Sequence, residues 1–262
     1  MLSNVRRKIV QKDIKKYSEL RISDWWSRNI VSYIRKYSHL GTQRYSKNKV
    51  KKTFEKNKIS LFVPYEIDDK IYNMIPCFRG TFTKGSNDPN DRNPLEEMKI
   101  KKAFLLGETE ITQEIYQAVM NVENPSKFQD NPKKPVERVS WYDAVMFCNR
   151  LSDIFDLDQY YTITKGGKIV DTIEPNKDYL VETNKNSKGF RLPTEWEWEY
   201  AAKAGTQLEY SGSDDVNEVG WHNDNSDKTT HPVKERNPNA WGFYDMSGNA
   251  VSYTHLTLPT KA

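Results

Sequence analysis

The sequence has only two cysteines in 262 residues, Cys77 and Cys148, and they lie far apart along the chain. A structural zinc knuckle needs cysteines two to four positions apart, so this spacing excludes one. Unpaired cysteine is among the residue types most often buried in folded proteins. We therefore expect two buried free thiols.

Long apolar runs are also missing. No stretch approaches the roughly 18 residues that a membrane-spanning helix requires. The N-terminal stretch MLSNVRRKIVQKDIKKYSEL carries basic residues but no apolar core, unlike a secretory signal. We therefore predict no membrane span and a cytoplasmic location.

Residues 1–60 have no proline, one glycine and few acidic side chains. They contain 17 Lys and Arg against four Asp and Glu, whereas the remainder has 23 basic and 32 acidic residues. Apolar residues, Trp25 and Trp26 among them, follow rough helical spacing within this basic stretch. Two interpretations stay open: helices that contact nucleic acid or an anionic surface, or a solvated, partly disordered extension.

Short strands are expected in the next part of the chain. Two are predicted within residues 74–86 and two within 98–112, from the alternation of apolar and polar residues. Residues 160–190 predict a hairpin-like insertion with a turn at Gly166 and Gly167. Residues 207–239 show no helical period and are expected to form loops.

Two helices are predicted from their first residues. Thr112 precedes the apolar-periodic segment QEIYQAVM and is a good N-cap residue. Ser140 and Asp143 form a capping-box pattern ahead of an apolar set that includes Cys148.

A third helix is predicted in spite of conflicting signals. The alternating segment WEWEY favours a strand when taken alone. Thr194 and Glu197, however, form a capping box, and Gly205 stands where a helix C-cap is expected. We therefore predict a helix here.

Seven sequence blocks, in this order, resemble the formylglycine-generating enzyme (sulfatase-modifying factor) family, in its bacterial form. The resemblance covers residues 71–250 and implies an α+β, modified C-type-lectin-like fold, loop-rich with short strands and two to three helices. The blocks are GTF at 80–82, ETEITQEIYQAVM at 108–120, NPS at 124–126, PVERVSWYDAVMFCNRLS at 135–152, GFRLPTEWEWEYAAKAG at 189–205, THPV at 230–233 and PNAWGFYDMSGNA at 238–250.

The chain departs from the family pattern at several positions. Arg79 and Lys234 stand where the family usually has Gly, Lys84 where Met is common, and Trp196 where Ala is usual. Family members continue from GNA into W-E-W, whereas this chain continues as VSYTHLTLPTKA. We interpret residues 251–262 as a sequencing-adapter artefact read as codons; the alternative is a genuine divergent strand.

The resemblance implies a definite chemistry for complete members. They oxidise a cysteine of a client sulfatase to formylglycine with oxygen, through a cysteine pair that holds Cu(I), a metal suited to thiolate ligands. That pair follows the W-E-W block, and neither Cys77 nor Cys148 matches it. The domain is therefore expected to be incomplete, without catalytic residues and inactive as written.

The resemblance also implies structural calcium. One site would use Asp245 with the carbonyl groups of Gly248 and Ala250, and its glutamate ligand would fall at Ser252. A second site would use Asn225 and the carbonyl of Ser226. Mixed carboxylate and carbonyl oxygens suit Ca²⁺, although the same groups also satisfy backbone donors in ordinary turns.

Two functions from different classes remain open. The first is an oxidase acting on a sulfatase or other client polypeptide, and the second is a non-catalytic lectin-like scaffold for binding or display. The sulfoxide synthase branch of the family is disfavoured, because His39 is the only His before His222. Arg191 is expected to form a structural ion pair with Glu197 or Glu199.

Overall fold

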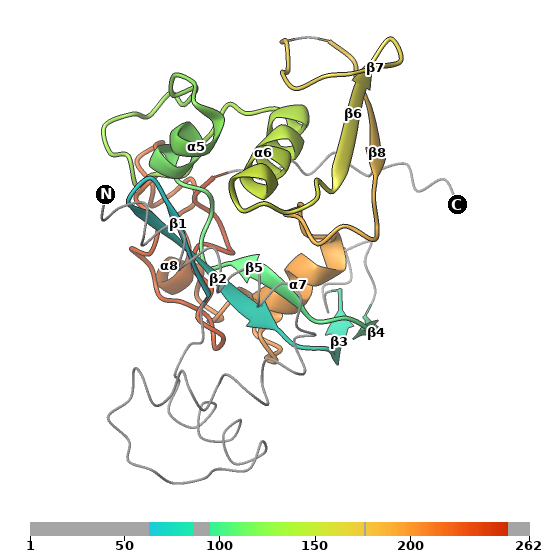
Figure 1. The fold of residues 1–262 in the computed structure, drawn as a ribbon. Helices are drawn as coiled ribbons and strands as arrows, with labels where there is room; N and C mark the ends of the chain where they lie inside the picture. Colours follow the sequence, from blue (N-terminus) through green and yellow to red (C-terminus); the bar gives the residue numbers. More distant parts are fainter. Residues whose placement is uncertain (1–62, 86–94, 176, 251–262) are drawn as a thin grey trace, which may run out of the picture.

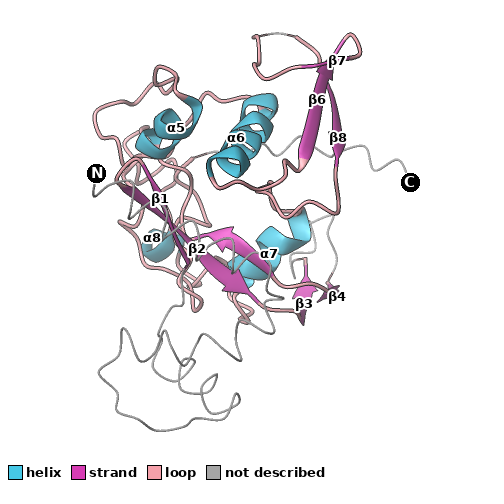
Figure 2. Ribbon diagram, in the orientation of Figure 1, coloured by secondary structure: helices cyan, strands magenta, loops and turns pink. Residues whose placement is uncertain are grey.

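A computed structural model of the chain describes residues 63–85, 95–175 and 177–250 (Figure 1). The predictions for residues 1–60 and 251–262 therefore lie outside the described residues. Three small sheets and four helices make up the described part, joined by long loops (Figure 2). The elements are β1 (Val63–Ile67), β2 (Lys70–Cys77), β3 (Gly80–Lys84), β4 (Glu96–Ile100), β5 (Phe104–Gly107), α5 (Gln113–Met120), α6 (Trp141–Ile154), β6 (Tyr161–Lys165), β7 (Lys168–Ile169), β8 (Leu180–Thr183), α7 (Glu195–Lys203) and α8 (Val216–Val219).

The first sheet carries the core of the domain. Its order is β1-β2-β5, and both pairings are antiparallel. Helices α5 and α6 lie over it and pack against each other through the stacked rings of Tyr116 and Phe147, whose centroids are 5.7 Å apart. Val145 and Leu151 are almost completely buried in the same core. The apolar face predicted for the second helix therefore faces inward, and Cys148 lies on it.

A second core forms where β3 and β4 meet α7. Tyr200 of α7 packs against Phe82 and Trp241, and its hydroxyl donates to the carbonyl of Phe78. A Cβ atom on Gly80 would lie 2.5 Å from the Tyr200 hydroxyl, so only glycine allows this approach without displacing the ring. Gly80 is therefore the first residue of β3 and also allows Tyr200 of α7 to pack closely against this strand.

The hairpin-like insertion is confirmed. Strands β6 and β7 pair across Gly166 and Gly167, both with positive φ, and β8 adds to the other edge of β6. Tyr161, Ile163 and Tyr179 of this insertion are buried in the first core, while its turn end projects outward (Figure 1). Ile169 and Leu180 of the insertion are strongly exposed.

All three predicted helix starts are confirmed. Thr112 caps α5, and Ser140 and Thr194 close complete capping boxes on α6 and α7. The segment WEWEY therefore forms a helix with a complete capping box, although its alternating pattern is typical of a strand. The helix ends at Lys203. Its C-cap is Ala204, in the left-handed conformation, one residue before the predicted C-cap Gly205.

Several details differ from the predictions. β2 and β3 do not pair with each other: β2 lies between β1 and β5, and β3 pairs with β4. Strand β1 lies upstream of residue 71, where the domain was expected to begin. The expected loop 207–239 contains α8, a four-residue helix too short to show a period. No helix in the described part is long and apolar enough to cross a membrane.

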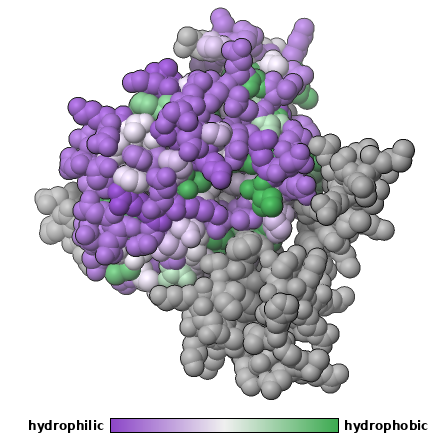
Figure 3. Space-filling model, turned by 90° about the vertical axis from the view of Figure 1, so that its left-hand side faces the viewer, coloured by the Kyte–Doolittle hydropathy of each residue, from purple (hydrophilic) through white to green (hydrophobic). Residues whose placement is uncertain are grey.

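The surface of the described part is largely polar on the face shown in Figure 3, with small and separate hydrophobic patches. Lys84 and Trp196, two of the residues that differ from the family pattern, contact each other. The Lys84 ammonium lies over the Trp196 ring, 4.3 Å from its centroid. Lys84 also pairs with Glu96 across β3 and β4. A lysine and a tryptophan at these positions are thus mutually compatible.

Candidate cation site and apolar cleft

The loops after α8 bring the block YDMSGNA back to the end of β5. The Tyr244 amide donates to the Glu108 carbonyl, which follows β5 directly. Asn249 donates its amide to the Trp221 carbonyl and its side chain to Glu110 and His231. These bonds fix residues 244–250 against the main sheet.

Asp245 is the most isolated carboxylate in this region. It is 6% exposed, and its Oδ2 accepts a hydrogen bond from the Lys234 amide. Its Oδ1 is buried without a hydrogen-bond partner among the described residues. Burial raises the pKa of Asp245, and the nearby Glu235 raises it further, while Lys234 opposes the shift.

Glu110 is a second carboxylate near Asp245 and is partly buried. Its two oxygens accept hydrogen bonds from the Ala250 amide and the Asn249 side chain. Desolvation raises the pKa of Glu110 well above its usual range, and the neighbouring charge of Asp245 adds to the shift. A buried and a partly buried carboxylate that repel each other form a place where a cation lowers the energy of both.

The first predicted calcium site fits this arrangement. An orphaned, buried oxygen on Asp245 next to another carboxylate is the donor chemistry that a hard cation requires. No cluster of three or more His, Cys, Asp and Glu able to hold a metal occurs in residues 63–85, 95–175 and 177–250. A cation here would therefore depend on carbonyl oxygens as well, as predicted for Gly248 and Ala250.

At the second predicted site, the groups that would bind the cation already make hydrogen bonds within the protein. The Asn225 side chain accepts from the His222 amide and donates to Asn217 and to the Gly220 carbonyl. The Ser226 carbonyl accepts from the Thr229 amide and lies 3.0 Å from the His231 ring. A cation would have to displace some of these bonds, so this site remains a prediction.

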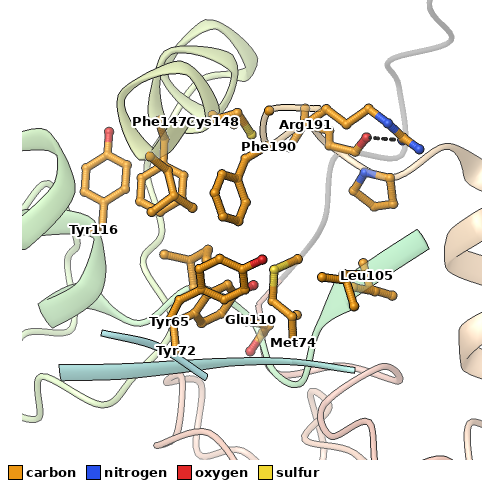
Figure 4. Close-up of a pocket in the computed structure, with 18 of the residues that line it drawn as sticks. Tyr65, Tyr72, Met74, Leu105, Glu110, Tyr116, Phe147, Cys148, Phe190 and Arg191 are labelled. Atoms are coloured by element: carbon orange, nitrogen blue, oxygen red, sulfur yellow. Dashed lines mark hydrogen bonds between the residues drawn. The ribbon is translucent and has the colours of Figure 1, made fainter. Parts of the chain in front are cut away.

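A large apolar cleft opens next to Glu110 and Ala250, which both line it. Its volume is about 680 Å³. Figure 4 shows its two walls, with Tyr72, Met74 and Leu105 of the sheet on one side and Phe147 and Phe190 on the other. The apolar lining comprises Val63, Tyr65, Tyr72, Met74, Pro76, Phe104, Leu105, Leu106, Ile111, Tyr116, Pro135, Val136, Val139, Ala144, Phe147, Cys148, Leu151, Leu157, Phe190, Leu192 and Pro193.

Both cysteines are buried free thiols, as predicted. Cys148 lines the cleft, and burial raises the pKa of its thiol to about 12. Cys77 lies in the second core, and burial raises the pKa of its thiol strongly as well. Because the thiolate is the reactive and metal-binding form, both thiols are poor nucleophiles and poor copper ligands.

Arg191 forms a structural ion pair with Glu197 at one end of the cleft. Its guanidinium makes two hydrogen bonds to the Glu197 carboxylate, of 2.7 and 2.6 Å (Figure 4). Glu197 also accepts from the Thr194 amide, so one carboxylate serves both the ion pair and the capping box. Glu199 instead pairs with Lys203 and accepts from the Gly85 amide.

Sequence reasoning missed Glu110 as a member of the cation site. It precedes α5 and is separated from Asp245 by most of the domain, so only tertiary contacts bring the two together. Glu110 lies inside the recognised block ETEITQEIYQAVM, which was the available signal.

The family model of the sulfatase-modifying factor enzyme 1-like domain matches residues 64–260. The chain therefore belongs to this family, and the described part has its loop-rich, C-type-lectin-like fold.

Individual relatives agree with this assignment. Chaperone protein LppX of Paenibacillus barcinonensis is 38% identical over 168 residues, which are 56% of this chain and 59% of LppX. The chain thus spans about three-fifths of LppX. Treponema denticola variable protein 1 matches with a TM-score of 0.67 and 37% identity, covering 73% of this chain and 75% of that one. CarF matches with a TM-score of 0.54 and 28% identity, covering 68% and 77%.

Proposed function

We propose that this domain is a calcium-stabilised, non-catalytic scaffold whose apolar cleft binds an extended polypeptide segment. The cleft carries the proposal, because protein interiors are close-packed and an apolar space of this size does not stay empty at little cost. Its volume of about 680 Å³ lies in the range of ligand sites.

Polypeptide is the ligand class that the surroundings favour. Ala250 lines the cleft, and its amide is held by Glu110, so peptide backbone already enters at this point. Most of the residues that line the cleft are aromatic or aliphatic. A few charged residues line it as well, among them Arg138, Lys188 and Arg191. Apolar side chains of a bound segment would fill the space between sheet and helix. The neighbouring cation site would hold residues 244–250 in place.

Peptide binding tests this proposal directly. We expect a fluorescein-labelled peptide of alternating valine and threonine to bind the full chain, measured as a rise in fluorescence anisotropy. A peptide of alternating aspartate and threonine is the matched control.

A blocking variant adds a second measurement. Ala144→Phe places a ring in the cleft and should abolish peptide binding, whereas Ala240→Phe adds the same ring at an exposed position outside it. If a chain shortened to residue 250 binds the peptide and the full chain does not, residues 251–262 are themselves the bound segment. Failure of both chains to bind the peptide would contradict the proposal.

An oxidase remains the second candidate function, and family membership supports it. Oxidation of a client cysteine through Cu(I) would require reactive thiols, and both thiols of this sequence are buried. We therefore expect the chain as written to leave the cysteine of a sulfatase-derived peptide unchanged in Cu(I) and oxygen. Mass spectrometry of the peptide checks this, and formation of formylglycine would overturn the scaffold proposal.

A further inference from the structure

Lys234 adopts a backbone conformation that disfavours lysine. Its φ is 70°, in the left-handed region where a Cβ atom costs about 1–2 kcal/mol. Such a conformation persists where surrounding contacts hold it. The contacts of Lys234 therefore indicate what offsets the strain.

The hydrogen bonds of Lys234 reach two carboxylates, and its ammonium also lies 5.6 Å from the centroid of the Tyr244 ring. The Lys234 ammonium lies 2.6 Å from Oε2 of Glu108, a residue only 8% exposed. The same oxygen accepts from the Asn73 side chain of β2. The Lys234 amide donates to Asp245, so this one residue joins the end of the main sheet to the loop that carries Asp245.

The surrounding charge is predominantly negative. Glu108 and Asp245 are buried at this point, Glu110 is partly buried, and Glu235 also acts on Asp245. Lys234 is the basic residue that faces Glu108 and Asp245 in the described part of the chain. The unpartnered Oδ1 of Asp245 is left for a further positive charge.

We propose that Lys234, whose side chain is 40% exposed, is a built-in counter-ion of these carboxylates. It holds the 230–250 loops without bound metal and weakens Ca²⁺ binding at Asp245. A fixed ammonium neutralises part of the negative charge in the absence of metal. The same ammonium repels a divalent cation that approaches the neighbouring carboxylates. The second effect rests on the cation site proposed above, whereas the first does not.

Matched lysine variants test the inference. Lys234→Met removes the charge and keeps an unbranched side chain at the strained position. Lys228→Met is the control, because Lys228 is an exposed lysine with a similar φ of 59°. Lys234→Gly removes the charge, the side chain and the strain, so its difference from Lys234→Met combines relief of the strain with lost side-chain packing and the greater unfolded-state freedom of glycine.

The measurements are melting temperature in EDTA and in Ca²⁺, and Ca²⁺ affinity by calorimetry, all on the full chain. We expect Lys234→Met to melt lower in EDTA than Lys228→Met and to bind Ca²⁺ about tenfold more tightly than the unmodified chain. Ca²⁺ should then restore most of the lost melting temperature.

Two other outcomes separate the proposals. If no variant binds Ca²⁺ but Lys234→Met still melts lower than Lys228→Met in EDTA, the counter-ion stands and the calcium site fails. If Lys234→Met is as stable as Lys228→Met in EDTA, the counter-ion proposal is overturned, whatever the Ca²⁺ affinity.

Discussion

Single residues in this domain often serve two contacts at once. Glu197 accepts both from the Arg191 guanidinium and from the amide that starts α7. Asn249 links Glu110, His231 and Trp221. The domain has few regular elements. Backbone groups in its loops therefore depend on such side chains as hydrogen-bond partners, where helices and strands would supply backbone partners. Changes at these positions should therefore be more costly than at ordinary surface positions.

Arg191→Lys should destabilise the domain. Lysine keeps the charge but loses the second hydrogen bond to Glu197, and the pair is largely shielded from solvent. We expect the free energy of unfolding to fall by about 1–2 kcal/mol in urea denaturation. Lys165→Gln in the exposed Lys165–Glu174 pair is the control and should change it by less than about 0.5 kcal/mol. Equal losses in both variants would contradict this.

At the scale of elements, caps decide what the apolar pattern leaves ambiguous. The segment WEWEY alternates like a strand, yet it forms α7 because Thr194 and Glu197 satisfy the first free amides of a helix. The main sheet shows what local patterns do not decide. Strands β2 and β5 were predicted in part from alternation, β1 was not predicted, and the pairing depends on which edges meet in three dimensions.

Thr194→Ala should test the weight of the α7 cap. Removing its hydroxyl leaves the Glu197 amide without its acceptor, and we expect a loss of about 1 kcal/mol in the free energy of unfolding. Thr162→Ala, at an exposed position on β6, is the control and should lie within about 0.5 kcal/mol of the unmodified chain. An unchanged midpoint for Thr194→Ala in urea would show that the Arg191–Glu197 pair or packing holds the helix without the cap.

At the scale of the whole molecule, the two cores bury many weakly acidic groups in their neutral forms. Burial raises the pKa of Tyr65 and Tyr116 from 10.0 to about 12, and that of the Cys148 thiol from 9.0 to about 12. The folded chain therefore keeps these protons at pH values where the unfolded chain has lost them. Their stabilising contribution is complete below pH 9 and is lost as pH rises towards 12.

Alkaline denaturation should follow from this difference. The free energy of unfolding is expected to decline steadily above pH 9, measured by urea denaturation in steps between pH 7 and pH 11. In the double variant Cys77→Ala/Cys148→Ala the decline should begin about one pH unit later, because both thiols are gone and the remaining tyrosines have unfolded pKa values near 10.0. Stability that rises above pH 9 would show that the tyrosines are not buried as described.

Much of this protein is determined by local sequence. The three capped helices, the Gly166–Gly167 turn, the buried thiols and the membership of the family all follow from residues close together in the chain. Each depends on short-range chemistry, such as a hydroxyl beside a free amide or a glycine in a left-handed turn. Even the Arg191–Glu197 pair spans only one loop and one helical turn.

Only the tertiary structure decided the rest. Glu110 meets Asp245, Lys234 reaches Glu108, and Gly80 fits beneath Tyr200, although each pair lies far apart in sequence. The cleft likewise arises from sheet, helix and loop together. Such features depend on which distant segments pack together, and the loops among these segments have no hydrophobic periodicity from which their packing could be predicted. Charge clusters and cavities are therefore properties of the packed chain, whereas caps and turns are properties of its sequence.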